Sequence, residues 1–477
     1  MRNLLLGNGI NIQFGGMAYT SSFIVKRIKY GAKVGAYNQL FDNIISGEEI
    51  IKIFEGLADN ANNVKKGEYD KYIDNNDTKE AIEDFKCRYK DYTIEKLHDV
   101  MLEDWFLLLY LFFLENEDLK ENKQTAIQGF EQLILDAIYN GGKIQEIYKN
   151  MGPNKKVKRH FKAYDNVFTL NYDNNIEMLT GKNVYHLHGD FSVLANSENE
   201  DNVSGYIRMQ DGTRVFREDM RHCYCNALLN YSGMLKKQQI DTNHRAIEAA
   251  DIMIERIKSD AEYRRQFEEL KINKPDDYRF IKTKIEHPEV SVATEYYFSE
   301  FENMEGELDI IGMSPNNDAH IFNAILNNNK LTKVTFYYMQ ENERKYVEDN
   351  YPKELFVCER VNSLWEQLDC QNEVNNYNYR MHLEFEKYID IFNKLSFDEI
   401  TPQKAKQEVN KIPQYEMNRL CRLVKEELHK RNPNRDSLTE KEFIEEISSI
   451  SLIALREGVL PTVLFLVCVM NFNKIKD

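Results

Sequence analysis

The first 370 residues alternate between short runs of apolar or β-branched residues and longer stretches whose apolar side chains recur every three or four positions. The stretches, among them 19–58 and 94–150, predict helices. The short runs predict buried strands at residues 3–6, 166–170, 184–187, 308–311, 334–339 and 356–357. Because strands that alternate with helices are typical of an α/β fold, we expect a parallel, Rossmann-like sheet with helices on both faces.

One of the helical stretches is apolar on almost every side. Trp105, Leu109 and Phe113 lie at i, i+4 and i+8 on one face, and the residues between them are largely apolar as well. We therefore expect this helix to be central in the core. Residues 60–80 are mostly polar and predict a surface loop instead.

Two segments depart from the alternation of strands and helices. Residues 236–285 are strongly charged and have helical spacing, so we expect a helical insertion at about 195–300. After residue 370, an Asn-rich stretch is followed by helical spacing with no clear strand. The sequence therefore predicts an α/β domain at 1–370 and an all-helical domain at 371–477.

The composition excludes several classes of protein. The chain has 477 residues, of which 42% are hydrophobic, so it can bury a large core and is not disordered as a whole. Its 62 Lys and Arg residues against 78 Asp and Glu residues give a net charge of −16, which disfavours direct binding of nucleic acid. The apolar runs 105–114 and 459–470 are shorter than the roughly 20 residues that span a bilayer. We also find no pattern of a signal peptide, and we expect a cytoplasmic protein without a membrane partner.

The seven cysteines are scattered and form no Cys-x-x-Cys pair. This distribution is typical of a reducing compartment, and it predicts that the chain has no zinc ribbon. One local cluster, His222-Cys223-Tyr224-Cys225, lacks a second pair of ligands at zinc-finger spacing. The packed edge of a strand or helix is therefore favoured there over a metal site.

Three of the predicted strands end in small or polar residues, at Gly7-Asn8-Gly9, Asn171-Tyr172-Asp173 and Gly312-Met313-Ser314. Ligands of open α/β sheets bind outside the carboxyl ends of the strands, so we expect these turns to converge on one crevice. The first turn suits a phosphate loop, because glycine lets the backbone approach a pyrophosphate; an ordinary turn between strand and helix is the alternative. The Asn and Asp of the second turn can hold a sugar or bond to the local backbone.

Two histidines, His186 and His188, are spaced so that both face the same side if their strand continues. They can form a metal-binding pair, or one of them can act as a general base, because imidazole titrates near neutrality. We expect the role of base for His188 and a structural role for His186.

The order of these motifs resembles that of the sirtuin-like superfamily, whose pattern is a Gly-Ala-Gly turn, a Gln-Asn-x-Asp segment and a His-Gly. The corresponding segments here are Gly7-Asn8-Gly9, Leu170-Asn171-Tyr172-Asp173 and His188-Gly189. They look like the bacterial branch found in anti-phage defence, which residues 310–314 and 317–321 also match. The N-terminal run through Tyr19 and Phe23 is similar to the abortive-infection subgroup AbiH, and the resemblance covers roughly residues 1–370.

The resemblance implies that the chain binds NAD, with no metal, and acts at the ribose carbon that carries nicotinamide. It implies that Asn171 holds the nicotinamide ribose or the attacking water and that His188 is the base. Asn8 and Asn11 depart from the family, which has Ala and Ser or Asp at these places. The NAD-binding residues that the resemblance implies, with pyrophosphate on the first loop and adenosine beside the last two, are Gly7, Asn8, Gly9, Asn11, Asp173, Gly189, Gly312 and Ser314.

Sirtuin deacylases form the cleft for their peptide with a four-Cys zinc ribbon, which this sequence lacks. We therefore expect an NAD+ glycohydrolase that releases nicotinamide and ADP-ribose and depletes cellular NAD as an abortive-infection effector. Because an unregulated NADase would kill its host, we expect the helical domain at 371–477 to act as a sensor or in oligomerisation. A non-catalytic module that senses NAD or ADP-ribose is the alternative, followed by an NAD-dependent protein deacylase. The partners that the resemblance implies are further copies of the chain, an ATPase of the HerA type or a phage-derived trigger.

Overall fold

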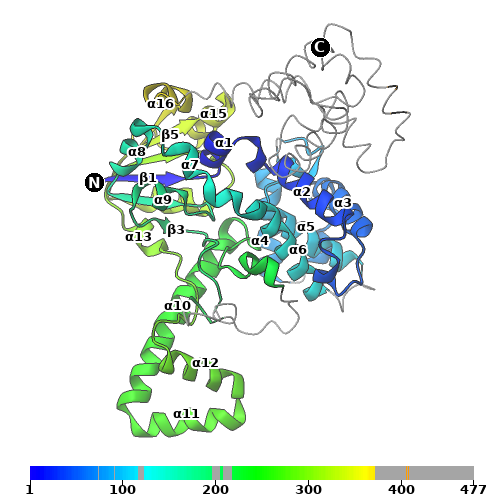
Figure 1. Ribbon diagram of the computed structural model, residues 1–477, viewed down its shortest axis with the longest axis vertical. Helices are drawn as coiled ribbons and strands as arrows, with labels where there is room; N and C mark the ends of the chain where they lie inside the picture. Colours follow the sequence, from blue (N-terminus) through cyan, green and yellow to red (C-terminus); the bar gives the residue numbers. More distant parts are fainter. Residues whose placement is uncertain are drawn as a thin grey trace, which may run out of the picture.

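The computed structural model describes residues 1–370 apart from 74, 91, 117–122, 196–204 and 208–216, together with residues 404 and 407. Its six strands form one sheet in the order β3-β2-β1-β4-β5-β6, and all neighbours are parallel (Figure 1). This is the strand order of the doubly wound Rossmann fold, so the predicted fold class is confirmed. The strands are β1 (Arg2–Leu6), β2 (Asn166–Thr169), β3 (Tyr185–His186), β4 (Gly306–Ile311), β5 (Leu331–Tyr338) and β6 (Phe356–Arg360).

Most of the remaining described residues are helical. The connection from β1 to β2 contains α1 (Gly9–Gly15), η1 (Met17–Tyr19), α2 (Ser21–Lys33), η2 (Asn38–Phe41), α3 (Gly47–Lys66), η3 (Asp70–Tyr72), α4 (Asn76–Arg88), η4 (Leu97–Asp99), α5 (Asp104–Glu115), α6 (Lys123–Tyr139), η6 (Asn140–Glu146), α7 (Tyr148–Met151) and α8 (Lys155–Lys162). The later helices are α9 (Asn175–Thr180), η8 (Glu218–Tyr224), α10 (Gly233–Ser259), α11 (Ala261–Asn273), α12 (Pro275–Glu286), α13 (Phe298–Glu302), α14 (Ala319–Asn327), α15 (Glu341–Asn350) and α16 (Val361–Gln367).

Alternate residues of the central strand β1 face opposite layers of the core. Leu4 and Leu6 belong to the layer that α1, α8, α9 and α16 help to form, whereas Leu5 belongs to the layer formed with α13, α14 and α15. All three leucines are fully buried. Helices therefore cover both faces, which is the usual arrangement of an all-parallel sheet.

The helices α2 to α6 gather in a lobe beside the sheet (Figure 1). Its centre is α5, where Trp105, Leu109 and Phe113 are buried as the spacing predicts. Within the described part of the chain, neither this helix nor any other is long and apolar enough to cross a bilayer.

The surface loop predicted at 60–80 is wrong for most of its length. Helix α3 continues to Lys66, and α4 already begins at Asn76. Leu57, Ala61 and Val64 of α3 are fully buried at helical spacing, so the polar residues between them lie on the exposed face of an amphipathic helix. The helix ends at Gly67, whose positive φ of 82° suits a C-terminal glycine cap.

The segment His222-Cys223-Tyr224-Cys225 packs against α6, as the sequence favoured. His222 Nε2 lies 2.9 Å from Asp136 Oδ1, and its ring stacks on Tyr139. Cys223 Sγ donates to the carbonyl of Gln132 at 3.2 Å. These contacts place the segment in the packed edge of a helix.

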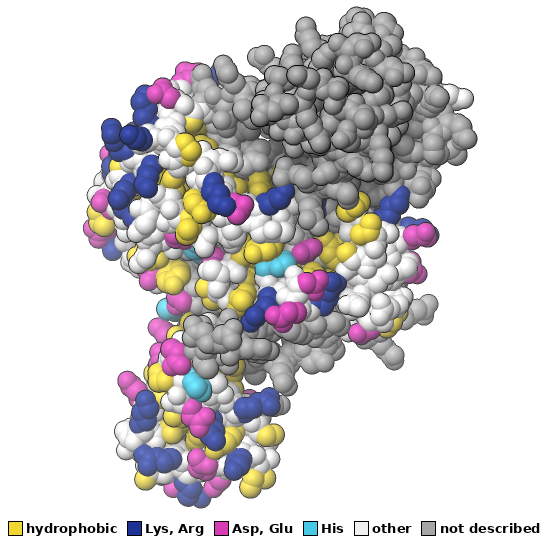
Figure 2. Space-filling model, in the orientation of Figure 1, with side chains coloured by type: hydrophobic (Ala, Val, Ile, Leu, Met, Phe, Trp, Pro, Cys, Tyr) yellow, Lys and Arg dark blue, Asp and Glu magenta, His cyan; other side chains and the backbone are white. Residues whose placement is uncertain are grey.

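The predicted insertion is helical and lies between β3 and β4. Helix α10 leaves the body of the molecule, and α11 and α12 form an arm at its far end (Figure 1). The arm has a small core of its own, made by Ile254, Ile257, Phe267 and Ile281. Acidic and basic side chains are interspersed over its surface (Figure 2). The predicted helical domain at 371–477 and the apolar run 459–470 lie outside the described residues, save for positions 404 and 407.

Candidate active site

The carboxyl ends of β1 and β4 meet at the point where the strand order of the sheet reverses. There, Gly7 N–H donates to the carbonyl of Ile311 at 3.0 Å, and Gly9 N–H donates to the carbonyl of Gly312 at 2.9 Å. A Cβ atom at Gly9 would lie 2.5 Å from Gly312 Cα, so a side chain cannot fit between the two turns. Glycine at these positions therefore allows two strand ends to pack against each other.

This packing affects the role predicted for the first glycine loop. The two backbone N–H groups expected to hold a pyrophosphate already donate to β4 and the turn after it. A phosphate can bind to these N–H groups only if the two turns separate. The loop still borders the crevice, because Gly7, Asn8 and Asn11 line a cavity beside it.

Two adjoining cavities occupy this edge of the sheet. The first has a volume of about 350 Å³, and both Asn171 and His188 line it, so the structure brings the two predicted catalytic residues together. The second measures about 910 Å³ and extends over β5 and α16. Residues that line both cavities are Asn8, Gly312, Met313, Ser314 and Asn317. Of the predicted NAD-binding residues, Asn8, Gly312 and Ser314 thus stand where the two cavities join.

Asn171 lies two residues after the end of β2, and its amide is held in one orientation. Asn171 Nδ2 donates to the carbonyl of Gly7 at 3.1 Å, which ties the end of β2 to that of β1. The amide oxygen has no hydrogen-bond partner among the described residues, and Asn171 lines the first cavity. It can therefore accept a hydrogen bond from a ribose hydroxyl or a water molecule.

Asp173 lies behind the cavity wall. Its Oδ2 accepts from Asn11 Nδ2 at 2.7 Å, and its Oδ1 accepts from both the backbone and the side chain of Asn175. Burial raises the pKa of this carboxyl group, while the bonds from Asn11 and Asn175 act in the opposite direction. Asp173 is not among the residues that line either cavity, so it shapes the pocket through Asn11.

Gly189 forms the turn behind His188. Its φ is +81°, and a Cβ atom there would lie 2.3 Å from the carbonyl oxygen of Asn226. Any other residue would be strained at this position. Like Asp173, Gly189 does not line either cavity.

The side chains of His186 and His188 do not lie on the same face of the sheet, because β3 ends at His186. The ring of His186 lies between the carbonyl of Asn171, at 3.1 Å, and Glu177 Oε1, at 2.6 Å. Burial alone would lower the pKa of His186, but the hydrogen bond with Glu177 and the nearby charges of Asp190 and Glu177 raise it to about 9. His186 is a structural residue that braces the backbone of Asn171.

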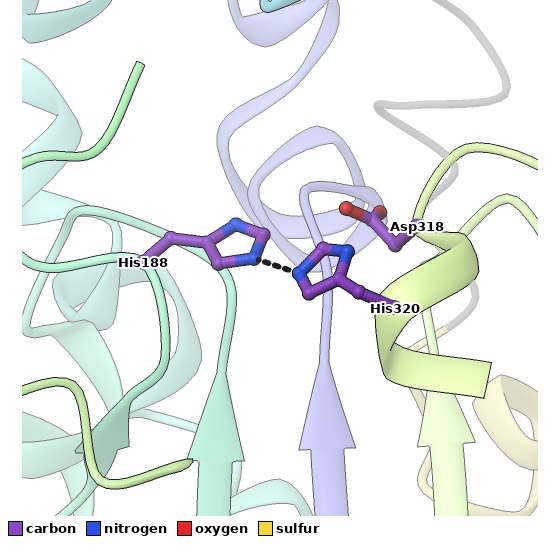
Figure 3. A group of neighbouring side chains, drawn as sticks. All are labelled: His188, Asp318 and His320. Atoms are coloured by element: carbon purple, nitrogen blue, oxygen red, sulfur yellow. Dashed lines mark hydrogen bonds between the residues drawn. The ribbon is translucent and has the colours of Figure 1, made fainter. Parts of the chain in front are cut away.

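His188 meets His320 and Asp318 (Figure 3), which come from the first turn of α14 and its N-cap position. The Nε2 atoms of His188 and His320 lie 3.0 Å apart, and both rings are buried. Lys236 of α10 lies 3.5 Å from His188 Nδ1 and 3.1 Å from Glu103 Oε1, with its side chain fully buried. Because an ammonium group can only donate, His188 Nδ1 is the acceptor and His188 Nε2–H donates to His320.

The environment keeps both imidazoles neutral. Burial, Lys236 and His320 hold the pKa of His188 well below its usual range, and burial together with Lys236 does the same for His320. Burial raises the pKa of Asp318 to about 6, although Lys236 opposes the rise. At pH 7 His188 is therefore unprotonated and keeps a lone pair, although the same surroundings weaken it as a base, while the carboxyl group of Asp318 is largely ionised.

The lining of the first cavity is acidic. Asp99, Glu103 and Asp318 contribute carboxylates to its wall. Neither cavity has a Lys or Arg among its lining residues within the described part of the chain. The first cavity therefore suits a ligand group that carries a positive charge.

Sequence reasoning missed Lys236, Glu103 and the role of His320. Lys236 lies in a helix with many charged residues, and nothing in the pattern marks it as the buried one. His320 belongs to the segment 317–321, which matched the resembled family, but the motif assigned it no function. Only the packing of α10 and α14 over the sheet brings these residues to His188.

Comparisons of this chain with family models, with curated proteins and with solved structures gave no match.

Proposed function

We propose that this protein hydrolyses NAD+ to nicotinamide and ADP-ribose. The observation that carries the proposal is that Asn171 and His188 open into one cavity at the switch point of a Rossmann-like sheet. Asn171 offers a fixed amide oxygen, and His188 offers a neutral imidazole. These groups suit the binding of a ribose and the activation of water.

The charge of the cavity also supports the proposal. The nicotinamide ring of NAD+ is a cation, and the positive charge moves to the ribose as the glycosidic bond breaks. Carboxylates of Asp99, Glu103 and Asp318 border the space in which this charge would develop, and of these Glu103 is paired with Lys236. Fixed charges of opposite sign stabilise such a transition state.

In the proposed reaction, the bond between C1′ and the nicotinamide nitrogen breaks, and neutral nicotinamide leaves with the electron pair. Water held by Asn171 Oδ1 then adds to C1′ and gives its proton to His188. The acceptor is His188 Nδ1, because Nε2 carries the proton that is donated to His320, and water reaches Nδ1 when Lys236 turns toward Glu103. The sum is NAD+ and water giving nicotinamide, ADP-ribose and a proton.

The rest of the dinucleotide would extend into the second cavity. Asn8, Ser314 and Asn317 line both cavities and offer polar groups along the path. Since no Lys or Arg lines this path within the described residues, neutral donors would have to hold the pyrophosphate. We therefore expect NAD+ to bind with modest affinity.

Incubation of the purified chain with NAD+, followed by chromatography for nicotinamide and ADP-ribose, tests the proposal. Asn171→Ala and His188→Ala should each slow nicotinamide release by about 100-fold or more, because a positioned base contributes about 10²–10⁴-fold. His244→Ala, on the partly exposed side of α10, is a matched control and should retain the parental rate. Equal rates in all four proteins would refute the assignment.

A chain that binds NAD+ or ADP-ribose tightly, yet releases no nicotinamide even during infection, would instead be the sensing module that the sequence left as the alternative. We propose that hydrolysis serves abortive infection, on the strength of the motif resemblance. Cells that carry the parental gene should then lose NAD after phage infection, and cells with His188→Ala should not.

A further inference from the structure

We propose that His188, His320 and Asp318 form a binding site for one divalent transition-metal ion, in the class of Zn²⁺ or Fe²⁺. One ligand atom from each residue lies within 4.8 Å of the other two, and the three side chains point toward one another (Figure 3). Two imidazoles and a carboxylate are a ligand set that such ions prefer. The pattern of the sequence offered His186 as the companion of His188, but the fold supplies Asp318 and His320 from α14 instead.

The separation of the two imidazole nitrogens fits a common ion. The Nε2 atoms of His188 and His320 are 3.0 Å apart. With metal–nitrogen distances of about 2.0–2.1 Å, two ligand nitrogens stand about 3 Å apart at a right angle and about 3.4 Å apart at a tetrahedral angle. The two rings meet nearly end to end, with their centroids 5.2 Å apart, so both must tilt before their lone pairs converge on one ion.

The charged groups around Asp318 also favour the binding of a cation. Arg88 Nη1 pairs with Asp104 at 2.6 Å, and Lys236 Nζ pairs with Glu103 at 3.1 Å. Asp318 has neither a hydrogen bond nor an ion pair to its carboxylate among the described residues, although it lies beside these four groups. Asp318 is only partly exposed, and a carboxylate in such a position is normally paired or coordinates a metal, so a divalent ion beside the two imidazoles would supply that partner.

The positive charge of Lys236 weakens the binding of a metal ion at this site. When Nε2 of His188 binds the metal, its proton moves to Nδ1, which faces Lys236 Nζ at 3.5 Å. Lys236 can direct its protons to Glu103 instead, but its positive charge still repels the ion. Loss of this charge should therefore strengthen metal binding, which sets this site apart from adventitious binding to surface histidines.

The test is a titration of the full chain, freed of metal, with Co²⁺ at pH 7.5, followed by the visible absorption of bound cobalt and by displacement with Zn²⁺. We expect one ion per chain, weakened by more than about 100-fold in His320→Ala and in Asp318→Asn, because loss even of an outer partner costs about 10–100-fold. Lys236→Met should tighten binding by at least about tenfold. His244→Ala should bind as the parent does.

Stoichiometric binding that neither His320→Ala nor Asp318→Asn weakens would overturn the proposal, as would the absence of binding. Circular dichroism of each variant shows whether it is folded. Asp318→Asn keeps the test decisive if His320→Ala unfolds, because Asp318 borders a cavity and its amide is isosteric.

One consequence rests on the proposed hydrolysis. A metal-bound His188 carries its remaining proton on Nδ1 and has no lone pair for water, so Zn²⁺ should inhibit nicotinamide release. If the metal binds and nicotinamide release rises, His188 is not the base, while the metal site stands. If no metal binds, the metal site falls and the hydrolase proposal is unaffected.

Discussion

Replacement of Gly9 by alanine tests whether the glycines of the first turn serve to pack β1 against β4. The new Cβ atom would lie 2.5 Å from Gly312 Cα and 3.1 Å from the Gly312 carbonyl oxygen. Both neighbours are backbone atoms, so the two turns must move apart by about 1 Å to reach ordinary contact distances of about 3.5 Å.

Two terms give the size of the effect. Overpacking of this kind costs about 1–3 kcal/mol, and loss of the bond from Gly9 N–H to the Gly312 carbonyl costs about 0.5–1.5 kcal/mol. We therefore expect Gly9→Ala to lower the free energy of unfolding by about 2–4 kcal/mol.

Gly56→Ala is the matched control for this substitution. Gly56 lies within α3, and a Cβ atom there would meet no heavy atom within 4 Å. The same substitution should therefore stabilise the protein by about 0.5–1 kcal/mol, because alanine loses less conformational entropy in a helix than glycine. Urea unfolding followed by circular dichroism measures both values. A Gly9→Ala protein as stable as the parent would refute the packing argument.

Three further substitutions test the surroundings of the site by urea unfolding. Asp104→Asn should lower the free energy of unfolding by about 3 kcal/mol, because it leaves the buried guanidinium of Arg88 without its fully buried carboxylate partner and with Asp84 alone; a loss below 1 kcal/mol would speak against this pair. Trp105→Ala should lower the free energy of unfolding by about 3–5 kcal/mol, because it leaves a cavity in the lobe. A smaller loss would mean that the lobe closes around the cavity. Asp173→Asn should cost about 1–3 kcal/mol, because an amide nitrogen would face the donors of Asn11 or Asn175; unchanged stability would show that these bonds contribute nothing.

The sheet was predictable from sequence because its strands are short apolar runs that stop at glycine or polar residues. Leu4 to Leu6 stop at Gly7, and the strand through Ile311 stops at Gly312. The polar stretch after residue 60 was wrongly predicted to be a loop, because the exposed face of a helix has the same polar composition as a loop. Its apolar positions, Ala61 and Val64, are too few to reveal the period without the preceding turns of α3.

The candidate site was predictable only in part, for a different reason. Asn171 and His188 follow strands, so the topology of a parallel sheet places them at one edge. Lys236 and His320 reach His188 through the way α10 and α14 pack on the sheet, which leaves no periodic signal in the sequence. The hydrogen bond from Gly9 to Gly312 could not be predicted from the sequence either, since it depends on the close approach of two turns.

The most direct test of the proposed function is a crystal structure of His188→Ala soaked with NAD+, because loss of the base should preserve the bound substrate. We predict that the nicotinamide ribose occupies the 350 Å³ cavity, with a hydroxyl group or a water molecule bonded to Asn171 Oδ1. A complex in which the nicotinamide ribose lies outside this cavity, away from Asn171, would contradict the proposal.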